Sequence, residues 1–103
     1  MSRQLPVSFV PRAKRETAAA ARWWRANREK APLAFEEELE KALDLISRQS
    51  AIGARATNMR LSGVRKLLLG RVQYHLYYRV VSTESRIEVL AIWHAARGEA
   101  PPI

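Results

Sequence analysis

Apolar residues recur along the chain first with the spacing of a strand and then with the spacing of a helix. The segment from Leu5 to Val10 alternates apolar with small or polar residues and stops at Pro11, which predicts a short strand. The proline at position 6 indicates that the strand lies at the edge of a sheet or only begins there, because proline cannot donate a hydrogen bond to a neighbouring strand. From Pro11 to Arg28, helical spacing predicts an amphipathic helix with its apolar stripe at Ala13, Thr17, Ala20, Ala21 and Trp24.

A second amphipathic helix is predicted to follow a polar link. Pro32 lacks an amide hydrogen and suits the start of a helix. The acidic run Glu36 to Glu40 then falls in the first turn, where carboxylates are stabilised by the helix dipole, so a solvated helix start is favoured over catalytic carboxylates. A link of about four residues predicts an antiparallel helical hairpin. The apolar stripe of this helix is Phe35, Leu39, Ala42, Leu43 and Ile46.

The second half of the chain predicts a sheet. After a surface connection from Ser47 to Ser62, three apolar segments cover residues 64–69, 72–81 and 86–94, and their short links indicate an antiparallel meander. Strict alternation in the third segment places Ile87, Val89, Ala91 and Trp93 on one face, opposite Glu88, Leu90, Ile92 and His94. The tail from Gly98 to Ile103 is expected to be irregular.

These elements together predict one α+β domain over residues 1–103. Its order is an N-terminal strand, a helical hairpin and a three-stranded antiparallel meander (β-α-α-β-β-β), with the hairpin packed on one face of the sheet. A chain of this length is expected to build a single modest core.

Composition narrows the classes of function. There is no cysteine and there are only two histidines, so we expect no disulfide, no metal site and no cofactor, and a cytoplasmic location. No apolar run is long enough to span a membrane. The net charge of +8 favours nucleic acid, ribosomes or an acidic protein as partners. A DNA-binding module is disfavoured because no helix-turn-helix pattern is evident.

Aromatic residues are expected to serve mainly in packing. Trp24 lies on the first helix stripe and Trp23 lies beside it, which favours a place in the core over a ligand cage. Tyr74, Tyr77 and Tyr78 alternate with basic residues as in a base-stacking platform, but packing in a central strand is the favoured interpretation.

The best candidate for chemistry is a basic constellation around one histidine. A ribonuclease acting without metal needs a base for the 2′-hydroxyl and cations for the phosphate in the transition state. His75, Arg65, Lys66 and Arg97 could supply both. Arg79 belongs to the same constellation, but it is four residues from His75 on one strand, about 13 Å, so the two could reach one phosphate only if their side chains converged. A solvated basic face, or one covered by a partner, is an equally open interpretation.

The chain resembles the ParE-like toxins of the RelE/ParE superfamily over nearly its whole length. The resemblance is carried in order by short stretches at residues 9–15, 21–28, 35, 39–46, 63–68, 74–80 and 87–94. It implies a toxin of a type II toxin–antitoxin pair, with the helical hairpin and antiparallel sheet predicted above.

Two activities are implied by this superfamily. The RelE branch implies a ribosome-dependent mRNA endonuclease. This chain departs from that branch at three positions: it has His75 where that branch usually has an arginine, Leu68 where a lysine is expected, and Ala96 where many relatives have the first of two arginines. Similarity to the ParE branch implies inhibition of DNA gyrase by a protein without its own active site. The second interpretation is favoured, and the endonuclease using His75, Arg65, Lys66 and Arg97 is the alternative.

The resemblance also implies a partner. We expect a cognate acidic, ParD-like antitoxin, partly disordered when free, to form a hetero-oligomer with this chain and to cover both the sheet and the hairpin. No membrane partner is expected. The residues expected to contact the antitoxin are Trp23, Trp24, Arg65, Tyr77 and Arg79.

Overall fold

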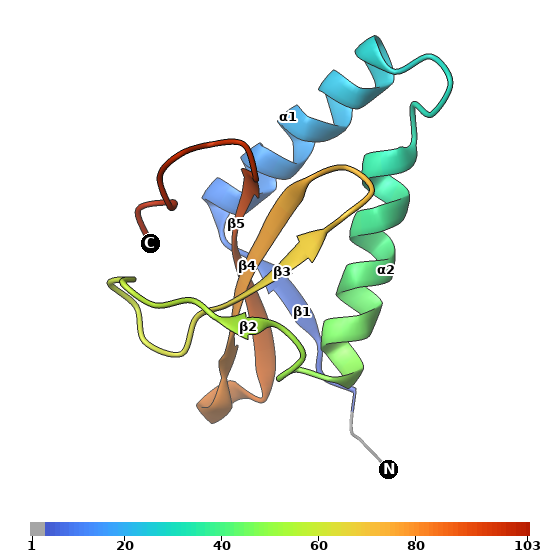
Figure 1. Ribbon diagram of the computed structural model, residues 1–103. Coiled ribbons are helices and arrows are strands. Elements are labelled where there is room, and N and C mark those ends of the chain that lie inside the picture. The colour runs from blue at the N-terminus through green and yellow to red at the C-terminus, as the bar shows by residue number, and fades with distance from the viewer. Residues whose placement is uncertain (1–3) are drawn as a thin grey trace.

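The fold is a five-stranded sheet with two helices against one face (Figure 1). The structure is a computed structural model and describes residues 4–103. The single domain predicted over residues 1–103 therefore includes three residues that lie outside the described part. The strand order is β1-β5-β4-β3-β2. Strand β1 (Val7–Phe9) runs parallel to β5 (Arg86–His94), and the other neighbours are antiparallel. The predicted α+β class, the element order and the edge position of the first strand are confirmed.

Both helices form where apolar spacing predicted them. Helix α1 covers Pro11–Asn27, with the proline in its first turn, and α2 covers Ala34–Arg48. The second helix begins two residues after Pro32, since the Ala34 amide first bonds back to the Ala31 carbonyl in a turn. The link is therefore longer than predicted. The acidic residues Glu36 and Glu37 lie in the first turn of α2 as expected.

The meander is formed by β3 (Arg65–Leu69), β4 (Tyr74–Val81) and β5, with a short 3-10 turn, η1 (Ser82–Glu84), before the last strand. One strand was missed by the sequence prediction. Residues Ala54–Arg55 form β2, which pairs with β3 inside the segment interpreted as a surface connection. Two residues carry too little periodicity to be recognised as a strand.

A bulge in β5 corrects the predicted faces of this strand. Tyr77 pairs with Ala91, whereas the next residue, Tyr78, pairs with Val89, so Leu90 is the extra residue. Beyond the bulge the faces are exchanged. Ile92 joins the core under the helices, and Ala91 and Trp93 join Leu90 on the opposite face. The strict alternation predicted for 87–94 is therefore correct through Leu90 and wrong from Ala91 onward.

A hydrophobic cluster lies on each side of the sheet. Its inner face packs on the helical hairpin through a core that includes Phe35, Ile46, Leu76, Tyr78 and Ile87. The outer face carries a second cluster of Val64, Tyr77, Leu90, Ala91 and Trp93, covered by Ala56, Met59 and Ile103 from the 56–64 loop and the irregular tail. Among the described residues, no helix is long and apolar enough to cross a membrane.

Candidate functional site

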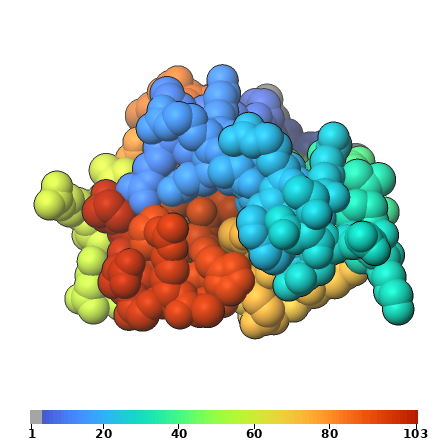
Figure 2. Space-filling view, turned by 90° about the horizontal axis from the view of Figure 1, so that it is seen from above, coloured from blue at the N-terminus to red at the C-terminus, as the bar shows by residue number. Residues whose placement is uncertain are grey.

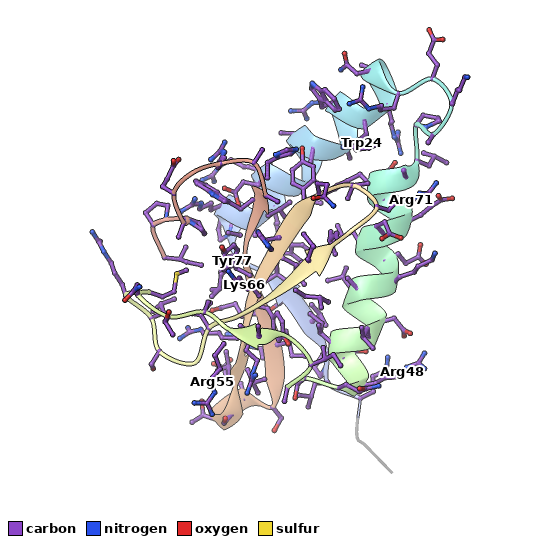
Figure 3. The ribbon with its side chains drawn as sticks, viewed as in Figure 1. Trp24, Arg48, Arg55, Lys66, Arg71 and Tyr77 are labelled. Carbon is purple, nitrogen blue, oxygen red and sulfur yellow. The ribbon has the colours of Figure 1, made fainter. Side chains whose placement is uncertain are left out.

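Three of the four residues predicted for ribonuclease chemistry gather on the outer face of the sheet. Lys66 pairs with Tyr77 across β3 and β4, and His75 pairs with Trp93 across β4 and β5. Residues directly opposite one another in a sheet point to the same side. Figure 3 shows Lys66 and Tyr77 side by side on their neighbouring strands. We call this surface, made of Lys66, His75, Tyr77, Trp93 and Arg97, the basic sheet face.

Arg97 is held on the basic sheet face by an aromatic ring. Its guanidinium carbon lies 3.9 Å from the centroid of Trp93, within the range of a cation–π contact. The Trp93 indole donates a hydrogen bond of 2.8 Å to the Glu99 carbonyl, which fixes the ring. Arg12 of α1 also approaches this ring, at 5.3 Å. Trp93 was not predicted as a site residue, because the bulge that turns it to this face has no evident signal in the sequence.

The surroundings of His75 favour the neutral form of its ring. Partial burial and then the positive charge of Lys66 lower the pKa of His75 below its usual value of 6.5. Its ring lies edge-on to Tyr77, with centroids 6.1 Å apart. A neutral imidazole beside a lysine and an arginine could accept a proton near an anion, so this surface has the elements of a weak general base and a phosphate-binding site.

Arg65 points away from this group. It pairs with Tyr78, whose side chain lies in the core under the helices, and its Nη1 donates a hydrogen bond of 2.8 Å to the Gly53 carbonyl. The Gly53 amide in turn donates to the Tyr78 hydroxyl at 2.9 Å. The structure therefore brings His75, Lys66 and Arg97 together on one face and places Arg65 in a structural node on the other.

The residues predicted to contact the antitoxin are dispersed. Trp24 is half-buried against the core near Tyr74, while Trp23 is 45% exposed, so the prediction that both tryptophans belong to the core is wrong for Trp23. Tyr77 is buried, which confirms its packing role, as is Tyr78. Arg79 forms an ion pair of 3.0 Å with Glu88 on the neighbouring strand.

A second candidate surface lies between the helices. An apolar groove of about 490 Å³ is lined by residues of both helices and by Phe9 of the edge strand β1. Charged side chains stand at its rim. We call it the hairpin groove; it is lined by Phe9, Lys14, Thr17, Ala18, Ala21, Glu36, Leu39, Glu40 and Leu43. A groove of this shape and chemistry fits an amphipathic segment of another chain.

A metal centre has no support in the geometry. Among residues 4–103 there is no group of three histidine, aspartate or glutamate side chains placed to hold a metal ion. The acidic residues of α2 instead form ion pairs with nearby cations, Glu36 with Arg25 at 2.7 Å and Glu37 with Arg71 at 3.1 Å.

The fold and the two surfaces define a small basic α+β domain with exposed apolar and cationic patches. The family model for the ParE toxin of the type II toxin-antitoxin system, parDE, matches residues 7–98. The chain belongs to this family of ParE toxins. No protein of curated function matches the sequence significantly.

Solved structures share the fold at low sequence identity. The chromosomal ParDE system from P. aeruginosa is 17% identical, with a TM-score of 0.69, over 88% of this chain and 96% of that chain. The toxin-antitoxin complex RelBE2 from Mycobacterium tuberculosis is 21% identical, with a TM-score of 0.64, over 88% and 98%. The isolated E. coli RelE toxin is 23% identical, with a TM-score of 0.56, over 92% and 88%.

Proposed function

We propose that this ParE-type toxin inhibits DNA gyrase and arrests growth, and that a ParD-like acidic antitoxin neutralises it. The observation that carries the proposal is the position of Arg65. One of the cations expected for an endonuclease site is bonded to the Gly53 carbonyl and lies on the opposite side of the sheet from His75. A toxin without an assembled catalytic set is expected to act by binding its target.

The hairpin groove supports the antitoxin part of the proposal. Its lining is mainly apolar, with Leu39 and Leu43 of α2 facing Ala18 and Ala21 of α1. A partly disordered partner can lay an amphipathic helix into such a groove while its carboxylates meet the net charge of +8. Apolar contacts are then expected to govern the dissociation rate, and electrostatic attraction is expected to govern the association rate.

Induced expression with two readouts tests the target. Under the gyrase proposal, plasmid DNA accumulates in cleaved form and mRNA stays intact. A His75→Ala/Lys66→Ala variant removes the base and its nearest cation from the basic sheet face but leaves the Arg65 node in place. This variant is expected to retain growth arrest, because an inhibitor spreads its affinity over an interface.

The second candidate function is a ribosome-dependent mRNA endonuclease using His75, Lys66 and Arg97. The gathering of these three residues on one face favours it, as does the lowered pKa of His75, which keeps the imidazole ready to accept a proton. Codon-phased mRNA cuts that disappear in His75→Ala/Lys66→Ala, with the fold intact by circular dichroism, would establish this function in place of gyrase inhibition.

A further inference from the structure

Helix α1 presents a purely cationic surface to solvent. It contains Arg12, Lys14, Arg15, Arg22 and Arg25, and its one acid is Glu16. The Glu16 carboxylate is occupied: one oxygen bonds Arg12 at 3.0 Å, and the other accepts the Ile92 amide at 3.0 Å. Its side chain is only 23% exposed. The negative charge of this helix is therefore turned inward, and only positive charge reaches its outer surface.

Two of these cations form a stripe along the most exposed line of α1. Arg15 and Arg22 are two turns apart, about 10.5 Å along the axis. Between them on the same line lie only Ala18 and Ala19, and all four residues are exposed. Among the described residues, neither arginine forms an ion pair, in contrast to Arg25, which is bonded to Glu36. Figure 2 shows α1, in blue to cyan, lying across the surface without another segment over it.

The stripe leads to an aromatic surface at the tip of the hairpin. Trp23 is 45% exposed, and the guanidinium carbon of Arg28, just beyond the end of α1, lies 4.8 Å from its ring centroid. The same turn carries the exposed Lys30 and, between it and Arg28, the exposed acid Glu29. An exposed indole bordered by cations offers both a stacking surface for a base and charge for its phosphates.

This surface fits nucleic acid better than protein. A protein interface is centred on large apolar anchors. The α1 stripe offers alanine methyl groups between its arginines, and one of these alanines, Ala18, also borders the hairpin groove beside it. A sugar-phosphate backbone requires cations and close approach, and alanines leave room for it. Such contacts need no recognition helix, so the absence of a helix-turn-helix pattern is no obstacle.

We propose that Arg15, Arg22 and Arg28 bind the phosphate backbone of a single-stranded nucleic acid, with Trp23 stacking on an unpaired base. This inference goes beyond the proposed function, because it concerns direct binding by the toxin alone and holds whichever target is correct. The ligand class is a single strand of any sequence, since phosphates and stacking surfaces are common to all bases.

Fluorescence anisotropy with a labelled oligothymidine of about 15 nucleotides tests the proposal on the full chain across a range of salt concentrations. Removing two phosphate contacts in Arg15→Ala/Arg22→Ala is expected to weaken binding at low salt by about tenfold or more and to reduce the slope of log K against log salt by about 1.4. The matched control is Arg55→Ala/Arg60→Ala, which removes the same charge from exposed residues of β2 and the following loop. The control is expected to bind nearly as the unmodified chain does.

Trp23→Ala is expected to weaken binding to the single strand by roughly five- to a hundredfold, as for the loss of one stacked base, while binding to a duplex of the same length changes little. Equal losses in the two double-arginine variants would overturn the proposal, because they would show that only net charge matters. Binding of polyglutamate as tight as that of the oligonucleotide would overturn it in favour of an acidic protein partner. An unchanged affinity in Trp23→Ala would show that Trp23 does not stack on a base, and it would overturn the proposed preference for single strands.

Discussion

The Tyr78 hydroxyl accepts a hydrogen bond of 2.9 Å from the Gly53 amide and donates one of 2.8 Å to the Ser50 carbonyl. Arg65 donates to the Gly53 carbonyl, so one tyrosine and one arginine fix the segment that leads into β2. This node joins the end of the helical hairpin to the middle of the sheet. It also holds Arg65 away from the basic sheet face. The choice between the two proposed activities depends on this position of Arg65.

Tyr78→Phe is expected to lower the free energy of unfolding by about 1–3 kcal/mol, because it leaves the buried Gly53 amide without its acceptor. Tyr77→Phe is the matched control: that tyrosine is equally well buried, and the structure gives its hydroxyl no hydrogen bond to residues 4–103. Urea denaturation of the two variants checks the difference. Equal stability would contradict the importance of the node.

Gly53→Ala is expected to be destabilising by about 1–3 kcal/mol through overpacking. A methyl group there would lie 2.8 Å from the Tyr78 hydroxyl oxygen and 2.9 Å from the Lys66 carbonyl oxygen, which is too close for either. Gly70→Ala tests the same change where nothing lies within 4 Å. Thermal unfolding should separate the two variants clearly, and a Gly53→Ala protein as stable as Gly70→Ala would show that the segment can move without cost.

Stability is expected to fall in mild acid through His75. Its pKa is lower in the folded chain than the usual 6.5, owing to burial and then to Lys66, so folding favours the neutral ring. The resulting stabilisation is present above the unfolded pKa and is lost as pH falls through the lower folded pKa. Urea titrations between about pH 7.5 and pH 5 should show a smaller pH dependence for His75→Gln than for the matched variant His94→Gln. An identical pH dependence in the two variants would contradict the assignment.

The hairpin groove gives a prediction for antitoxin binding. Ala18→Arg places a long charged side chain in the groove lining and is expected to speed dissociation of the antitoxin at least tenfold, which corresponds to about 1.4 kcal/mol. Ala19→Arg makes the same substitution on the neighbouring residue, which lies outside the groove lining, and should leave dissociation nearly unchanged. Surface plasmon resonance with the cognate ParD-like antitoxin measures both rates. Similar dissociation of both variants would place the antitoxin elsewhere.

The sequence predicted the helices and the meander because their apolar stripes are long enough to be read with the correct period. It could not predict the bulge at Leu90, because a single extra residue leaves the composition of the strand unchanged while exchanging the faces of Ala91, Ile92 and Trp93. That exchange brings Trp93, and Arg97 with it, onto the basic sheet face.

The separation of Arg65 from Lys66 follows from alternation along β3, but its bond to Gly53 depends on β2, which is too short to recognise. Exposure of Trp23 depends on its angular position on α1. Its side chain is 45% exposed, and the guanidinium of Arg28 lies against its ring. In both cases the environment of the residue is determined by the packing of distant segments, which the local sequence pattern does not show.

Purified toxin added to gyrase and supercoiled plasmid tests the central claim most directly. The gyrase proposal predicts that linear plasmid accumulates after the protein is removed with detergent and protease, that His75→Ala/Lys66→Ala still produces it, and that the antitoxin abolishes it. Unchanged gyrase products, together with codon-phased cleavage of mRNA on added ribosomes that requires His75 and Lys66, would contradict the proposal.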